Sequence, residues 1–181
     1  MSAIQELMEM RDDLPFTPTH RAARRPGTEA GHVAKLMDPD LTRAFALAGN
    51  AICTVVSRAS GQRFTFKLQR PKDEDQRARR PIFVSVLAGP QNDSDYAHLG
   101  TIWEEGGVLV AYRHGAKSRI AADAPSARAA AWFAKALAAP DLLDQCEVWH
   151  EGRCGRCGRR LTVPSSIASG IGPECASIMG G

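Results

Sequence analysis

Three of the five cysteines, Cys154, Cys157 and Cys175, lie near the C-terminal end of the chain, and this clustering constrains the fold more than any other feature. Two residues separate Cys154 from Cys157. The small residues Gly155 and Gly158 let the backbone fold back so that both sulfurs face one ion. Because the number of cysteines is odd and their distribution uneven, a disulfide framework is not expected. The spacing predicts a zinc knuckle in which Cys175 supplies a third thiolate.

A closed structural zinc site takes four ligands, so the three thiols leave one position to be filled. His150 is the first choice because it lies shortly before Cys154, Cys146 is the second, and a water or another ligand is the third. We expect Cys53, within an apolar stretch, to be a packed small hydrophobe. A redox role for Cys154 and Cys157 is disfavoured because the pair does not lie in a βαβ unit. We therefore predict a structural zinc ion whose removal unfolds the tail.

Composition sets wide limits on the rest of the chain. The 181 residues are 44% hydrophobic and 24% charged, which is typical of a globular protein with a sizeable core. The net charge of +3 does not by itself indicate a nucleic-acid partner. The longest apolar runs are too short for a membrane span, and the N-terminal sequence lacks the pattern of a signal peptide. We therefore expect no membrane association and a cytoplasmic location.

Hydrophobic periodicity predicts an α+β fold. A helix is expected from Asp38, with Asp38 as its N-cap and Pro39 in its first turn, and a second helix over 125–138. Alternating patterns predict an antiparallel meander of about five strands. The expected strands cover residues 51–58, 63–69, 82–87, 99–103 and 108–112.

Shifts in composition divide the chain into three parts. Residues 1–37 are expected to form a flexible arm, because a short amphipathic piece is followed by prolines and a basic run. Residues 38–145 form the α+β domain, with a charged surface loop over 70–81. Residues 146–181 form the zinc-binding module.

Two groups of basic residues are candidates for binding nucleic acid or another anion. The first surrounds the predicted knuckle, where arginines can contact a phosphate backbone or simply be solvated, and comprises Arg153, Arg156, Arg159 and Arg160. The second follows a predicted strand and comprises Arg113, Lys117 and Arg119. The segment 115–118 lacks the glycine spacing of a phosphate-binding loop, so nucleotide hydrolysis is not predicted.

The C-terminal motif resembles a known type of domain. The residues that carry the resemblance are Cys154-Gly-Arg-Cys157-Gly-Arg-Arg-Leu-Thr-Val-Pro164 and Gly170-Ile-Gly-Pro173-Glu-Cys175. They are similar to a small zinc-binding domain of unknown function found in phage, prophage and actinobacterial proteins. Segments between residues 45 and 100 are similar to hypothetical phage proteins with this ending. The resemblance implies a phage accessory protein, whose cytoplasmic location would be that of the bacterial host, and it supports the three cysteines as ligands. No activity is known for proteins of this kind.

These observations favour two function classes. The arginines favour binding to nucleic acid, whereas a phage accessory or anti-defence factor would instead recognise a host protein. A third and less favoured alternative is an enzyme that acts on a nucleotide or nucleic acid, because no set of serine, cysteine and histidine residues indicates a nucleophile and no acidic pocket is apparent. The oligomeric state does not follow from the sequence.

Overall fold

The computed structural model describes residues 34–71 and 79–180. The expected N-terminal arm, up to residue 33, and the centre of the charged loop lie outside the described residues. The strands are β1 (Ala34–Leu36), β2 (Asn50–Ser57), β3 (Arg63–Gln69), β4 (Arg79–Leu87), β5 (Tyr96–Glu105), β6 (Val108–His114) and β7 (Cys146–His150). The helices are α2 (Pro39–Ala46), α3 (Pro125–Ala138), the 3₁₀ helix η1 (Pro140–Gln145), α4 (Pro164–Ser169) and α5 (Pro173–Met179).

The described strands form one antiparallel sheet in the order β1-β7-β2-β3-β4-β5-β6. The predicted α+β class and the meander from β2 to β6 are confirmed, but the sheet has seven strands rather than five. The two additional strands are β1 and β7. Strand β7 returns to the edge of the meander, where Cys53 pairs with His150. Residues 146–150, expected in the zinc-binding module, are therefore a strand of the sheet.

Helix α2 begins as its sequence predicts. The side chain of Asp38 accepts a hydrogen bond of 2.9 Å from the Leu41 amide, and Pro39 occupies the first turn. Its apolar side directs Phe45, which is 1% exposed, towards the beginning of β2 and the C-terminal segment. The helix thus supplies the surface on which the cysteine-containing segment lies.

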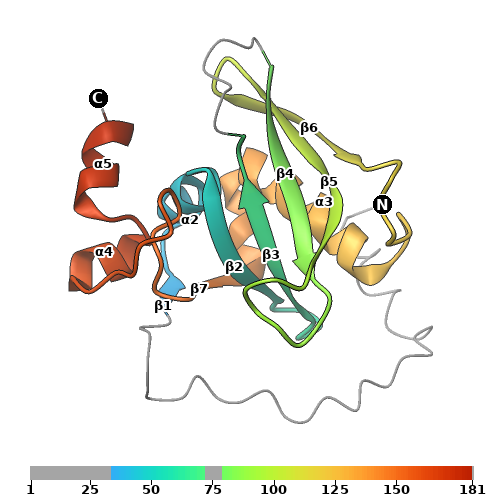
Figure 1. Ribbon diagram of the computed structural model, residues 1–181, viewed down its shortest axis with the longest axis horizontal. Coiled ribbons are helices and arrows are strands. Elements are labelled where there is room, and N and C mark those ends of the chain that lie inside the picture. The colour runs from blue at the N-terminus through green and yellow to red at the C-terminus, as the bar shows by residue number, and fades with distance from the viewer. Residues whose placement is uncertain (1–33, 72–78, 181) are drawn as a thin grey trace.

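The two faces of the sheet differ in character. One face packs against α3 through buried side chains such as Phe66 and Phe133, whose rings stack 6.2 Å apart. The opposite face, termed here the open face, is not covered by α3 and faces the viewer in Figure 1. Strand alternation directs Lys67, Phe83 and His98 to this face. The sheet therefore has one side buried in the core and one side partly exposed.

Within the described part of the chain, no helix has the length and apolar character needed to cross a membrane.

Candidate metal centre

The three C-terminal cysteines converge in space. The sulfur atoms of Cys154, Cys157 and Cys175 all lie within 4.8 Å of one another, with Cys154 and Cys175 buried and Cys157 exposed. Cys154 and Cys157 lie on a tight turn in which the Gly158 amide donates to the Cys154 carbonyl at 2.9 Å. Cys175 comes from the first turn of α5. Three thiols in this arrangement can hold a metal ion.

Hydrogen bonding and burial give the thiols of Cys154 and Cys175 different pKa values. Burial tends to raise the pKa of Cys154. Hydrogen bonds from the amides of Gly172, Cys157 and Arg156 and from the Cys157 thiol outweigh this effect and lower it to about 7. Burial and the two neighbouring thiols raise the pKa of Cys175 to about 11. Cys154 is therefore more readily ionised than Cys175, and a divalent metal would stabilise the thiolate form of both.

The structure does not bring His150 into this cluster. Its Nε2 lies 2.7 Å from the Ile167 carbonyl, and its Nδ1 accepts a 3.0 Å hydrogen bond from the Gly152 amide. Both ring nitrogens are thus engaged by the backbone, which requires the neutral ring with its proton on Nε2. Burial lowers the pKa of His150, although the bond to Ile167 opposes this effect. His150 connects β7 to the segment that precedes Cys175.

The other two cysteines also lie outside the cluster. The Cys146 thiol donates to the Leu143 carbonyl at 3.4 Å, and burial raises its pKa to about 11. Cys53 is completely buried in β2, where burial raises the pKa of its thiol to about 12. The packing role predicted for Cys53 agrees with this position. The cysteine proposed from the sequence as an alternative fourth ligand, Cys146, is instead part of the sheet and its underlying core.

The segment that carries the cysteines, residues 151–180, is termed here the C-terminal module, and it lies against α2. The Asn50 amide donates to the Gly155 carbonyl at 2.7 Å, so the knuckle is joined to the start of β2. A Cβ added to Gly155 would lie 2.7 Å from the backbone oxygen of Phe45. The sequence gives no sign that Phe45 is the contact surface for the module. The apolar position of Phe45 on a predicted helix indicated burial but not its partner.

Gly170→Ala is expected to lower the free energy of unfolding by about 3 kcal/mol, because it combines two costs. Gly170 has a φ of 72°, and its added Cβ would lie 2.4 Å from Cδ2 of Phe45. Gly61→Ala is the matched control, since Gly61 has a φ of 70° but no atom within 4 Å of an added Cβ. The control should lose about 1–2 kcal/mol from backbone strain alone. The free energy of unfolding of both variants is measured by urea denaturation. If Gly170→Ala and Gly61→Ala lower it equally, contact with Phe45 does not hold the module.

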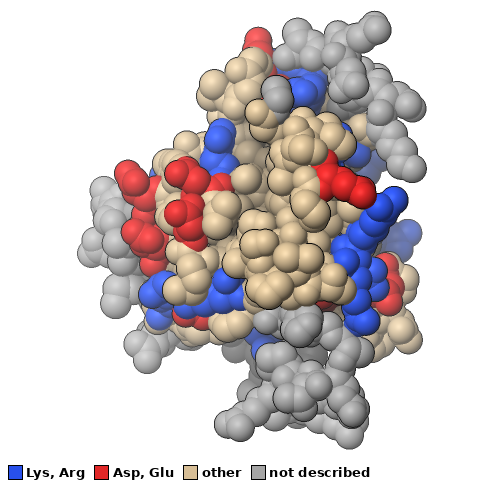
Figure 2. Space-filling model, turned by 90° about the vertical axis from the view of Figure 1, so that its left-hand side faces the viewer, with Lys and Arg blue, Asp and Glu red and all other residues tan. Residues whose placement is uncertain are grey.

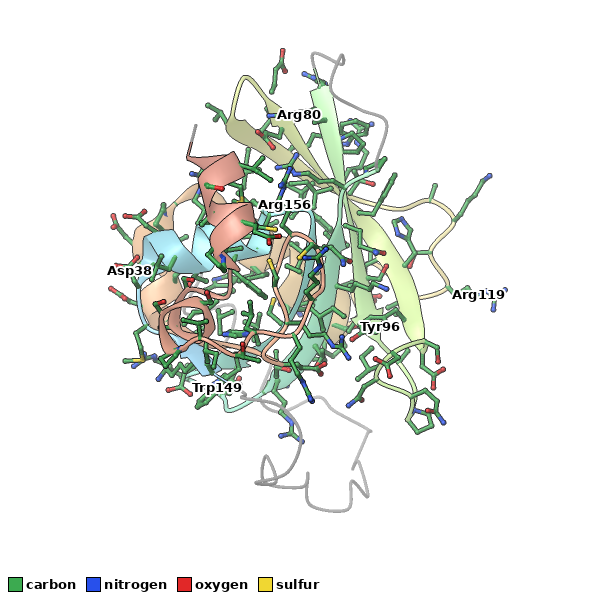
Figure 3. All side chains as sticks on the ribbon, turned by 60° about the vertical axis from the view of Figure 1, so that its left-hand side comes forward. Asp38, Arg80, Tyr96, Arg119, Trp149 and Arg156 are labelled. Atoms are coloured by element: carbon green, nitrogen blue, oxygen red, sulfur yellow. The ribbon has the colours of Figure 1, made fainter. Side chains whose placement is uncertain are left out.

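The predicted basic residues lie in two separate places. Arg153 and Arg160 form an isolated bridge beside the knuckle, Arg159 is 3.3 Å from Glu174, and Arg156 is exposed. Figure 2, which views the side of the molecule where the module lies, shows Lys and Arg on both the left and the right of this face, interspersed with Asp and Glu. Arg113 lies on β6, and Lys117 and Arg119 follow it in a loop. Arg156 and Arg119 are well separated in Figure 3.

Comparison with known proteins adds one finding. Residues 149–180 match a family of unknown function, DUF6011. No curated protein and no solved structure matches the chain. The matched residues contain all three clustered cysteines, so the C-terminal region is a domain of unknown function with a candidate metal site.

Proposed function

We propose that this chain is a nucleic-acid-binding protein in which a structural zinc ion holds the C-terminal module and the module presents its arginines to phosphate groups. The observation that carries the proposal is the position of the four predicted arginines on the hairpin that also supplies Cys154 and Cys157. A rigid turn limits the entropy lost when arginine side chains bind a phosphate backbone. The metal would therefore support binding without contacting the nucleic acid.

Cys154, Cys157 and Cys175 would be three of the zinc ligands, with the fourth position left to a water or another ligand. Three thiolates form a soft ligand set, which favours zinc among the common divalent ions. We assign His150 a structural role because its ring nitrogens are already bonded to Ile167 and Gly152. The zinc would cross-link the knuckle to α5.

The charge of the module supports a polyanionic partner. Residues 151–180 contain four arginines and two glutamates, and hence a net charge of +2 from their side chains. Glu174 is paired with Arg159 at the surface, at 3.3 Å, where both side chains are more than three-quarters exposed. Such an exposed ion pair contributes little to stability, so Arg159 can exchange it for a phosphate contact.

Binding to a labelled duplex and a labelled single strand should fall steeply with salt, and Arg156→Ala should weaken both. Each lost phosphate contact should reduce the slope of log K against log salt by about 0.9 for a duplex and about 0.7 for a single strand. Arg128→Ala is the matched control, because Arg128 is an exposed arginine on α3. Fluorescence anisotropy across a salt series provides the measurement. No binding at low salt, or an equal effect of the two substitutions, would contradict the proposal.

A second candidate function is recognition of a protein partner, as expected of a phage accessory or anti-defence factor. Its specific support is a set of exposed apolar side chains on the module, namely Val163 at 48%, Ile178 at 60% and Met179 at 42%. Binding to a protein through these residues would tolerate salt and would be lost on Ile178→Asp. The phage origin itself is proposed only from the resemblance of the C-terminal motif.

A further inference from the structure

We propose that the open face of the sheet binds single-stranded nucleic acid, with bases stacking on Phe83 and His98 and phosphates contacting Lys67, Arg113, Lys117 and Arg119. This inference rests on the proposed nucleic-acid function and names the surface and the kind of strand.

Aromatic rings lie on the open face where unpaired bases could reach them. Phe83 is 42% exposed although it occupies the middle of β4, and His98 is exposed on the neighbouring strand β5. Their ring centroids lie 6.2 Å apart in an edge-on arrangement. Tyr96, which is only partly exposed and has a buried hydroxyl, continues the row along β5, and Lys67 Nζ lies 5.3 Å from the centre of its ring. Exposed aromatic side chains on a sheet are the usual platform on which bases stack.

Cations border these rings. Arg113 lies opposite Thr101, which in turn lies opposite Phe83, so Arg113 shares the open face. A pocket of about 460 Å³ beside the face is lined by Tyr96, His98, Lys117 and Arg119. Within the described ranges, Arg113, Lys117 and Arg119 make no ion pair. These three cations and Lys67 are therefore available to a phosphate backbone.

Three carboxylates near the face, those of Asp93, Asp95 and Glu151, reduce its positive charge but are outnumbered by the four cations. Asp95 lines the same pocket, and its carboxylate accepts hydrogen bonds from the Gln91 amide at 2.9 Å and the Ser94 hydroxyl at 3.1 Å. Asp93 and Glu151 lie at the other end, where they line a second pocket with Lys67 and Arg153. This second pocket joins the open face to the module. Figure 3 shows Tyr96 between Arg156 of the module and Arg119 of the loop in that view.

The shape of the platform favours a single strand over a duplex. The major groove of B-form DNA admits a helix or a two-stranded ribbon, whereas the open face belongs to a seven-stranded sheet. Rings on such a face can contact only bases that are not already stacked in a duplex. A strand crossing from Arg119 past His98 and Phe83 towards the module would meet cations and rings in turn. Both proposed binding surfaces would then contact one ligand.

The deciding experiment compares binding of fluorescein-labelled oligo(dT) by the full-length protein and by three variants. Phe83→Ala and the double substitution Lys117→Ala with Arg119→Ala test the rings and the cations, and Phe83→Leu retains apolar area without the ring. We expect Phe83→Ala and Phe83→Leu each to weaken binding by about 5- to 150-fold, as is typical for loss of one stacked base. Val108→Ala is the control for a nonspecific loss of binding, because Val108 is an exposed side chain on β6. Circular dichroism checks that each variant folds.

Photocrosslinking of an oligonucleotide that carries 5-iodouracil independently identifies the residues at the binding site, since the reaction requires contact with a protein side chain. Crosslinks in peptides containing Phe83, Tyr96 or His98 are expected. Binding that is weakened by Arg156→Ala but unaffected by the Phe83 and Lys117/Arg119 substitutions would overturn this inference and leave the proposed function intact. Tighter binding to duplex than to oligo(dT) would likewise overturn it. Absence of binding to either ligand would overturn both proposals.

Discussion

Cys175→Ala is expected to abolish metal binding and to unfold the C-terminal module while the sheet remains folded. The module has only short helices, and the three sulfurs that lie within 4.8 Å of one another are its central contact. Zinc binding contributes about 10–16 kcal/mol in small zinc-finger peptides, which exceeds what such a segment gains from burial. Native mass spectrometry should find one zinc in the wild-type protein and none in the variant.

Hydrogen exchange should locate the unfolding in the same variant. The amides of Gly155 and Leu161, which donate to the carbonyls of Gly170 and Gly152, should lose protection by at least about a hundredfold, whereas amides in β3 and β4 should keep theirs. Removal of zinc from the wild-type protein by a chelator should reproduce this pattern. Protection that survives the loss of metal would contradict a structural role for the ion.

Two control variants test the assignment of the ligands. Cys146→Ala and His150→Gln should both retain zinc, because the Cys146 thiol is bonded to Leu143 and both ring nitrogens of His150 are bonded to the backbone. His150→Gln should nevertheless lower stability, since the hydrogen bonds of a buried group are not easily replaced. Loss of zinc in His150→Gln with the module still folded would restore His150 as the fourth ligand. Zinc retained in Cys175→Ala would reject the three-cysteine site.

Local patterns in the sequence were sufficient for the central part of the fold. Alternation over 63–69 directs Phe66 inwards and Lys67 outwards, and the structure follows this pattern. The N-cap at Asp38 was also predictable, because its hydrogen bond to Leu41 spans three residues. Features of this kind depend on residues that are close in the sequence.

Features that depend on distant residues were not predictable in this way. Strand β1 has only three residues, and its partner, β7, lies more than a hundred positions later, so neither has a local signal of pairing. The environment of His150 shows the same limit. Its position shortly before Cys154 suits a metal ligand, but its ring nitrogens are engaged by Gly152 and Ile167. The exposed rings on the open face became apparent only once strand register placed Phe83 beside His98.

Glu104→Ala is expected to lower the free energy of unfolding by about 3–5 kcal/mol, the usual cost of leaving a buried charge without its partner. Glu104 is only 6% exposed, and its carboxylate accepts hydrogen bonds from both Arg70 and Arg80. Arg70 also donates from Nε to the Leu47 carbonyl at 3.1 Å, so this cluster links β5 to the end of α2. Arg80, labelled in Figure 3, approaches from β4. The substitution would leave two guanidinium groups without their shared carboxylate.

Glu105→Ala is the matched control for this effect, because the neighbouring residue makes an exposed ion pair. Glu105 lies 2.9 Å from Arg79, and both side chains are at least half exposed, so the loss should be below about 1 kcal/mol. The loss of stability in Glu104→Gln should lie between those of Glu104→Ala and Glu105→Ala, since the amide keeps one acceptor oxygen but loses the charge. Urea unfolding followed by tryptophan fluorescence gives all three values. Similar losses for Glu104→Ala and Glu105→Ala would show that burial does not strengthen the pairing of Glu104, and that the end of α2 is held to the sheet by apolar contacts alone.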